Sequence, residues 1–229
     1  FIAICLVLSP DVTGQTWSLA TPERGKTEMF LIPYPAEVIR KGGKVRFSTL
    51  TAALNSPEIR EHAGRIMMEL ADVREFWQMP EYSRKNECPI SFGPLAGEGG
   101  KEGAYRLSVS ARGITIRANG YAGNFNALQT VRQLIRMEKP GSYTLPCIEI
   151  EDSPAFDVRG VMLDVGRNYM PLPFIKEVVR KLSYYKINVL HLHLTDDPGW
   201  RLEIKKYPEL TDSSVFWRTR QPGKYYTQQ

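Results

Sequence analysis

The chain of 229 residues has room for one large domain or two modest ones, because domains usually contain about 100 to 200 residues. Its hydrophobic fraction of 42% and charged fraction of 24% are ordinary for a soluble globular protein. The net charge of +5 comes from Lys and Arg scattered among Asp and Glu without a long basic run, so the composition does not favour nucleic acid as a partner.

The first residues have the character of a signal-peptide core. Phe1–Leu8 is an unbroken apolar run, and Val12 and Gly14 fit the small-residue positions before a cleavage at Gln15. A buried strand is the alternative interpretation, but no turn or pairing partner flanks the run. The run is too short for a membrane span, which needs about 20 apolar residues. We therefore expect a secreted or periplasmic protein, with 1–14 as the remnant of a signal peptide that lacks its Met and basic leader.

The cysteines leave two interpretations open. Cys5 would be removed with a signal peptide, and Cys88 and Cys147 then fit either one disulfide in an oxidising compartment or two free thiols. Their spacing is not of a metal-binding type. We expect neither a metal centre nor a cofactor.

The part of the chain that follows mixes strand and helix patterns. The predicted elements are a strand near 45–48, a helix over 57–73, a strand at 90–92, a hairpin over 105–117, a helix over 125–134 and a strand at 147–150. The helical periodicity of the second helix predicts that Gln129, Arg132 and Gln133 face solvent. Together these elements predict a compact α+β domain, which we place at 15–152.

After Asp152-Ser153-Pro154 the pattern changes. A strand over 158–165, a helix that starts near Pro171 and a second strand over 189–194 indicate a strand–helix–strand crossover with parallel strands. Both strands carry few charges and need cover on both faces, which implies a larger parallel sheet or barrel. We place this second domain at 153–229.

Polar residues cluster where each of these two strands should end. They are Asp164, Arg167 and Asn168 after the first strand, and His191, His193, Asp196, Asp197, Trp200 and Arg201 in or after the second. Ligands of parallel α/β proteins bind at the carboxyl ends of the strands. Arginine can grip adjacent sugar hydroxyls, aspartate can accept hydroxyl hydrogen bonds or orient a general acid, and tryptophan offers a flat face to a pyranose ring. The residues alone therefore predict an α/β-barrel enzyme for a carbohydrate or another polar substrate.

Each of these residues also has a structural alternative. The two histidines of the second strand point to the same side and could be core residues bonded to the backbone. Asp196 and Asp197 point to opposite sides, so one of them could be a cap. Asp164 could simply hold Arg167 by a salt bridge.

Two blocks of the second half are highly specific. They are RGVMLDVGRNYMP at 159–171 and YKINVLHLHLTDDPGWR at 185–201, and the match continues through 204–211. These blocks closely resemble the opening of the catalytic barrel in glycoside hydrolase family 20, the β-N-acetylhexosaminidases. The first half resembles the small domain that precedes this barrel, and its cues are IPYP at 32–35, the hairpin at 105–117 and NALQTVRQL at 126–134. The resemblance implies an α+β N-terminal domain followed by the beginning of a (β/α)8 TIM barrel, truncated after its second strand.

The resemblance implies an exo-acting glycosidase that releases terminal non-reducing β-N-acetylhexosamine from glycans by substrate-assisted retaining catalysis. The substrate's 2-acetamido oxygen attacks the anomeric carbon, while an Asp-Glu pair deeper in the barrel orients the acetamide and protonates the leaving oxygen. The sequence ends at Gln229, before a third strand, so we expect this pair in later sequence and the 229-residue chain itself to be inactive.

The resemblance also implies residue roles. Arg167 matches the residue that binds hydroxyls of the non-reducing-end sugar. Asp196 matches one member of a hydrogen-bonded pair that supports the catalytic acid, and its histidine partner would come from later sequence. The other substrate-binding candidates are His193, Asp197 and Trp200. Asn168 departs from the family's pattern, in which histidine is common.

Two other functions stay open on the sequence. One is a non-catalytic carbohydrate-binding relative that lacks the acid pair. The other is a different glycosidase with a similar leading domain, such as an α-glucuronidase or an enzyme that cleaves O-linked N-acetylglucosamine. The latter fits the first half of the chain but not the blocks around Arg167 and Asp196-Asp197. The partner expected first is a glycan that ends in N-acetylhexosamine.

Overall fold

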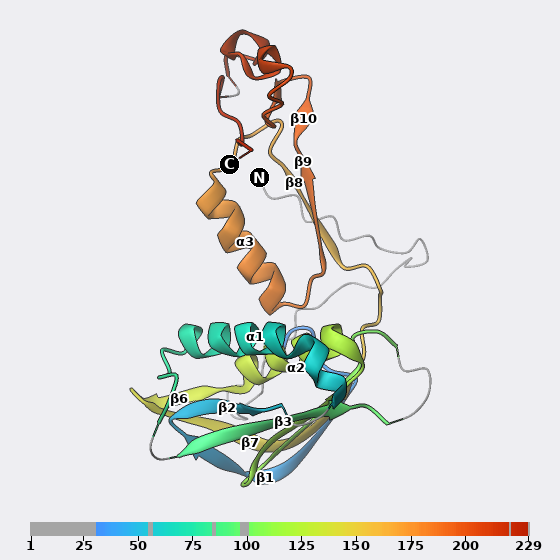
Figure 1. Cartoon of the computed structure of the whole chain (residues 1–229), viewed down its shortest axis with the longest axis vertical. Coiled ribbons are helices and arrows are strands. Elements are labelled where there is room, and N and C mark those ends of the chain that lie inside the picture. Colours follow the sequence, from blue (N-terminus) through green and yellow to red (C-terminus); the bar gives the residue numbers. More distant parts are fainter. Residues whose placement is uncertain (1–30, 55–56, 84–85, 97–100, 220, 229) are drawn as a thin grey trace, which may run out of the picture. The chain divides into compact units, whose positions relative to one another are not determined.

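The computed structural model describes residues 31–228, apart from 55–56, 84–85, 97–100 and 220, so the expected signal peptide at 1–14 lies outside the described residues. The chain divides into two compact units (Figure 1): the N-terminal unit ends at Asp157 and the C-terminal unit begins at Val158. None of the helices in the described ranges is long and apolar enough to cross a membrane.

The N-terminal unit is built on a seven-stranded mixed sheet with the order β1-β7-β4-β5-β3-β2, and β6 also pairs with β7. The strands are β1 Glu37–Phe47, β2 Thr49–Ala53, β3 Glu87–Pro94, β4 Tyr105–Ser110, β5 Gly113–Ala118, β6 Arg136–Lys139 and β7 Ser142–Asp152. Pairing is antiparallel from β1 to β5 and parallel from β5 to β2. The mixed sheet agrees with the expected α+β class.

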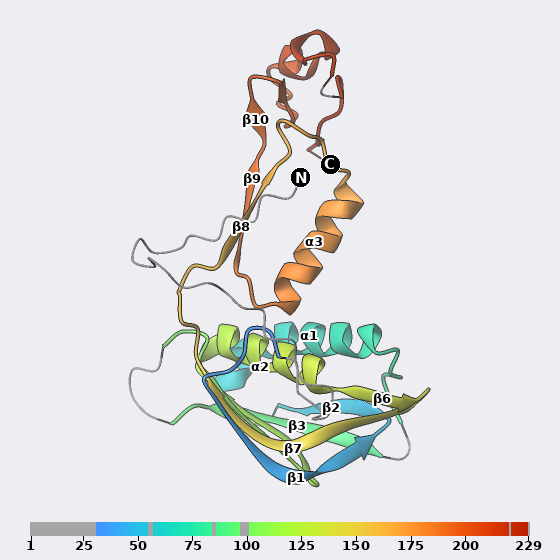
Figure 2. The ribbon, with the colours of Figure 1, turned by 180° about the vertical axis from the view of Figure 1, so that it is seen from behind.

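Two helices cover one face of this sheet (Figure 2). They are α1, Ala63–Phe76, which follows a 3-10 helix at Pro57–His62, and α2, Gly120–Leu134. The predicted hairpin is confirmed, because β4 and β5 pair from Tyr105↔Ala118 to Ser110↔Gly113. Its alternating apolar side chains at 105, 107 and 109 are buried, and the polar ones between them are exposed or half-buried.

The prediction that the polar side of α2 faces solvent is wrong. Gln129, Arg132 and Gln133 are all buried. Arg132 donates to Asp72 Oδ2 of α1 at 2.7 Å, and Gln133 exchanges two hydrogen bonds with the backbone of Ile32, at 2.8 and 2.9 Å. Helical periodicity identifies the face that packs on the sheet, but it cannot show that α1 and the chain near residue 32 cover the other sides.

Both cysteines of the described residues are free thiols. Cys88 lies on β3 and Cys147 on β7, and these strands are not neighbours in the sheet. Burial raises the pKa of Cys88 to about 11. Of the two interpretations that the sequence left open, the structure shows the free thiols.

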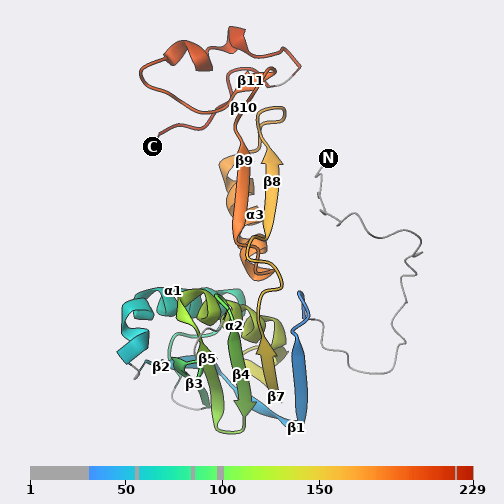
Figure 3. The ribbon, with the colours of Figure 1, turned by 90° about the vertical axis from the view of Figure 1, so that its right-hand side faces the viewer.

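The C-terminal unit begins with the predicted strand–helix–strand crossover. Strand β8, Gly160–Asp164, helix α3, Leu172–Tyr184, and strand β9, Val189–His193, follow in order, and the two strands pair in parallel (Figure 3). Leu163, Val165 and Ile175 form the buried core between strands and helix. A short hairpin of β10, Thr195–Asp196, and β11, Gly199–Trp200, comes next, followed by 3-10 helices at Pro208–Thr211 and Ser213–Val215.

Candidate functional site

The site lies at the carboxyl ends of β8 and β9. The parallel register places Asp164 beside His193, at the last paired position of each strand. The N–H of Gly166 then donates to the carbonyl of His193 at 2.8 Å, which keeps the two chains together beyond the strands. Segments that are about 30 positions apart in sequence therefore present their polar side chains at one edge.

Arg167 is the centre of the polar cluster. Its Nη1 lies 2.9 Å from Asp164 Oδ2, its Nη2 lies 2.9 Å from Asp196 Oδ2, and its backbone N–H donates to Asp164 Oδ1 at 3.0 Å. The Arg167 side chain is 55% exposed, whereas the carboxylates are 22% and 21% exposed. Each carboxylate therefore binds one terminal nitrogen of the guanidinium, and the remaining N–H donors stay accessible to a ligand.

Asp196 connects this ion pair to its neighbours. Its Oδ2 lies 3.6 Å from Nε2 of His193, and its Oδ1 accepts the backbone N–H of Asp197 at 2.7 Å. The Oδ2 atom is shielded from solvent, so the positive charge of Arg167 is what compensates its burial. The expected proximity of Arg167 and Asp196 is thus observed, and the structural alternative for Asp164, a salt bridge with Arg167, is observed as well.

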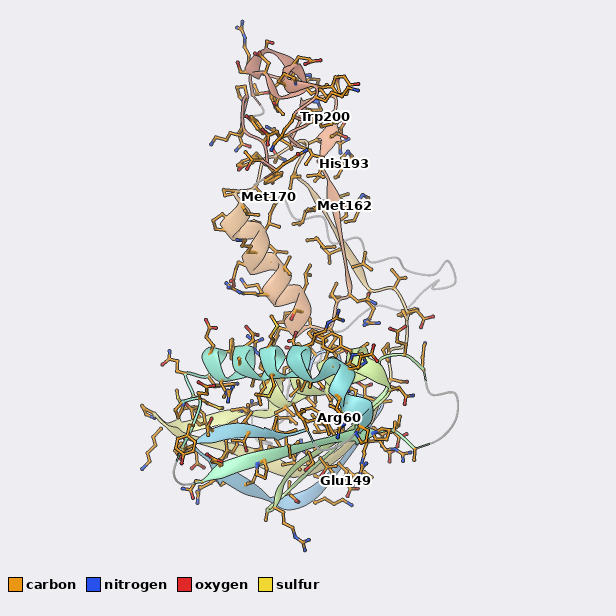
Figure 4. All side chains as sticks on the ribbon, viewed as in Figure 1. Arg60, Glu149, Met162, Met170, His193 and Trp200 are labelled. Atoms are coloured by element: carbon orange, nitrogen blue, oxygen red, sulfur yellow. The ribbon has the colours of Figure 1, made fainter. Side chains whose placement is uncertain are left out.

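The structure places the other site candidates less centrally. Figure 4 shows His193 at the end of β9 and Trp200 on the hairpin that follows. In that hairpin Trp200 pairs with Thr195 and Asp196 pairs with Gly199, so Trp200 and Asp196 project to opposite faces. The indole N–H of Trp200 donates to the carbonyl of Leu202 at 2.7 Å. Asp197 is exposed and contacts the cluster through its backbone.

Three of these groups have the spacing of metal ligands. Oxygen and nitrogen atoms of Asp164, His193 and Asp196 lie within 4.8 Å of one another. A cation would have to displace the guanidinium of Arg167, which already pairs with both carboxylates. The donor set is therefore that of an arginine-centred ion-pair cluster, and we assign it no metal.

One residue beside the site was not assigned a role from the sequence. Arg201 has no exposed surface, and its guanidinium donates to four backbone carbonyl groups, those of Val165, Gly166, Gln221 and Lys224, at 2.8 to 3.2 Å. Burial lowers the pKa of this guanidinium. The sequence places Arg201 among the polar residues after the second strand, but no local pattern separates a buried arginine from a ligand-binding one.

Gly199 is a second residue that sequence reasoning missed. A Cβ atom at Gly199 would lie 2.4 Å from Cδ1 of Phe216, whose ring also lies 4.8 Å from the Arg201 guanidinium carbon. The hairpin can therefore pack under Phe216 only where this position lacks a side chain.

The cluster fits a polyhydroxyl ligand. An arginine held between carboxylates offers directed donors, and the carboxylates beside it offer acceptors, so neighbouring hydroxyls of one ring can bind both. In the sequence, the two parallel strands that carry this cluster follow a separate α+β unit, and the cluster has the donors and acceptors that suit a polar ligand. The chain belongs to glycoside hydrolase family 20: residues 28–153 match its domain 2, and residues 156–229 match its catalytic domain.

Individual relatives agree with this assignment. A β-hexosaminidase of Vibrio furnissii is 32% identical over 241 residues, which cover 96% of this chain and 38% of that protein. The solved β-N-acetylhexosaminidase of Bacteroides fragilis has a TM-score of 0.71 and 29% identity, covering 88% of this chain and 40% of that one. The exo-β-N-acetylglucosaminidase of Vibrio harveyi in complex with N-acetylglucosamine has a TM-score of 0.69 and 29% identity, covering 86% and 32%. The chain therefore spans about two fifths or less of these relatives.

Proposed function

We propose that this chain contributes the leading domain and one wall of the sugar pocket to an exo-acting β-N-acetylhexosaminidase. The substrate is a glycan with a terminal non-reducing β-linked N-acetylglucosamine or N-acetylgalactosamine. The observation that carries the proposal is the Arg167 guanidinium, which Asp164 and Asp196 hold at the carboxyl ends of β8 and β9 in a family 20 chain. The related Vibrio harveyi enzyme was solved in complex with N-acetylglucosamine, which supports the same sugar class.

In the proposed mechanism Arg167 binds hydroxyls of the terminal sugar. The substrate's acetamido oxygen attacks the anomeric carbon, the glycosidic bond breaks, and a general acid protonates the leaving oxygen, giving an oxazoline-type intermediate that water opens with retained configuration. The acid and the residue that orients the acetamide are an Asp-Glu pair outside this chain. Asp196 supports that acid, with a histidine that also lies outside the chain. His193, Asp197 and Trp200 complete the substrate contacts in this proposal.

The proposal includes a larger architecture. The crossover formed by β8, α3 and β9 is the start of a (β/α)8 barrel, and the domains run over 15–152 and 153–229. Export, which the apolar run at 1–8 of the signal-peptide remnant 1–14 predicts, would place the enzyme in the periplasm or outside the cell, where glycans are accessible. The barrel is supported by the parallel pairing of β8 and β9, which one helix, α3, connects.

The test uses the reading frame extended through a complete catalytic domain. We expect this protein to release the chromophore from an aryl β-N-acetylglucosaminide and the 229-residue chain to release none. Sugar binding without hydrolysis by the extended protein would instead identify a non-catalytic carbohydrate-binding relative. Neither binding nor hydrolysis, by a folded extended protein, would refute the proposal.

A further inference from the structure

Arg201 is buried inside the C-terminal unit, where it contacts the Arg167 loop, the segment 165–171 between β8 and α3. It follows β11, it has no exposed surface, and the ring of Phe216 lies over its guanidinium at 4.8 Å. A ligand cannot reach a side chain in this position. Whatever Arg201 contributes to the site must therefore act through its neighbours.

The first set of neighbours is the backbone that leads into Arg167. Nε of Arg201 donates to the carbonyl of Val165 at 3.1 Å and to the carbonyl of Gly166 at 3.2 Å. The second of these carbonyls belongs to the peptide group that joins Gly166 to Arg167. Arg201 thus fixes the two consecutive peptide groups that precede the Cα atom of Arg167.

The second set of neighbours lies on the far side of the same loop. Nη1 of Arg201 donates to the carbonyls of Gln221 and Lys224, at 2.9 and 2.8 Å. The Gln221 side chain in turn accepts the backbone N–H of Tyr169 at 2.8 Å. Tyr226 donates its hydroxyl to the carbonyl of Met170 at 2.7 Å. The guanidinium of Arg201 therefore links the start of the loop, at Val165 and Gly166, to the segment 221–226. That segment binds the end of the loop, at 169–170.

We propose that Arg201 is a positioning residue that aims the Arg167 guanidinium at the hydroxyls of the bound sugar. The inference rests on the proposed function, since it needs Arg167 to bind substrate. The rigid fork of a guanidinium can hold carbonyls on two sides at once, whereas the single ammonium of lysine cannot reproduce that geometry. Without the hydrogen bonds from Arg201, the backbone before Arg167 could move. The ion pairs with Asp164 and Asp196 would then set the position of the Arg167 guanidinium by themselves.

The experiment is a double-mutant cycle in the extended, active protein, with an aryl β-N-acetylglucosaminide as substrate. We expect Arg201→Lys to lower kcat/KM by about 30-fold, mainly through KM, because a misplacement of about 1 Å can cost on the order of 100-fold. In an Arg167→Ala background, the same change should lower kcat/KM by less than about 3-fold, since the residue it positions is gone. A purely structural role would give equal factors in both backgrounds.

Arg159→Lys is the matched control. Arg159 precedes β8 at its opposite end and also binds a backbone carbonyl, that of Lys186, at 2.8 Å. Its effect on kcat/KM should be the same factor with and without Arg167. Thermal unfolding of each variant reports whether it is folded at the assay temperature.

Tyr226→Phe covers the case in which Arg201→Lys does not fold. It removes only the hydroxyl that binds Met170, and we expect a rise of about 3-fold in KM that disappears in the Arg167→Ala background. Equal effects of the folded variants in both backgrounds, or a wild-type KM in Arg201→Lys, would overturn the inference. An inactive, folded wild-type protein would instead refute the proposed function, before any variant is made.

Discussion

Nη2 of Arg167 lies 2.9 Å from Oδ2 of Asp196, although the two residues follow different strands and are separated by the whole of α3. The parallel register of β8 and β9 makes this contact possible, because it sets Asp164 and His193 side by side and brings the following residues to one edge. The contact leaves a half-exposed guanidinium whose orientation is fixed on its buried side.

Replacing Arg167 with alanine should lower kcat/KM of the extended protein about 100-fold, because charge-assisted hydrogen bonds to substrate are worth about 3 kcal/mol at most each. Steady-state hydrolysis of an aryl β-N-acetylglucosaminide measures the change. Arg180→Ala is the control, since Arg180 lies on α3 with its side chain 70% exposed and pairs only weakly with Glu177 at 4.0 Å. Activity of Arg167→Ala within a factor of about three of wild type would exclude Arg167 from the sugar site.

Gly199→Ala should destabilise the C-terminal unit by about 1–3 kcal/mol, because the new Cβ would overlap Phe216. Urea unfolding measures the loss. Combining Gly199→Ala with Phe216→Leu should recover part of it, because the smaller side chain vacates the contested space. Gly64→Ala in α1 is the matched control: its Cβ meets nothing within 4 Å, and alanine should stabilise the helix by about 0.5–1 kcal/mol. A neutral Gly199→Ala would show that the hairpin packs differently.

Stability should fall at alkaline pH through Tyr121. Burial and the hydrogen bond that its hydroxyl donates to Glu69 raise the pKa of Tyr121 to about 12, from an ordinary value near 10. Between these values the folded protein keeps a proton that the unfolded chain loses, so the free energy of unfolding decreases as pH rises.

Urea titrations between pH 9 and 12 test this for wild type and Tyr121→Phe. The variant should show a shallower decline above pH 10. Cys88, whose burial raises its pKa to about 11, adds a decline in the same direction that both proteins share. Parallel curves for the two proteins would contradict the role of Tyr121.

Limited proteolysis should leave a stable N-terminal piece that ends between Asp152 and Arg159. Strand β7 ends at Asp152, and the side chains of Phe156 and Val158 are both more than 70% exposed, so the backbone between the units offers a cleavage site outside regular structure. Mass spectrometry of the resistant piece locates its end. First cleavage within β4 to α2 would show that the N-terminal unit is not independently stable.

Sequence patterns predicted the elements of both units well where one face of an element is apolar. The hairpin around residue 112 and the strand–helix–strand crossover follow from alternation and from helical spacing, which depend only on neighbouring residues. The same reasoning failed for Gln129, Arg132 and Gln133, because helix α1 and residue Ile32, both distant in sequence, cover the side of α2 that its own pattern marks as polar.

The sequence by itself determined the family, through the two blocks around Arg167 and Asp196, and it determined that both residues follow parallel strands. The tertiary structure alone decided that Asp164 and Asp196 share the guanidinium of Arg167. It also decided that Arg201 is buried against the backbone that precedes Arg167. Local periodicity records which side of an element is apolar. The partner of a charged side chain depends on strand register and on chain segments brought together from far away, and a linear pattern does not contain that information.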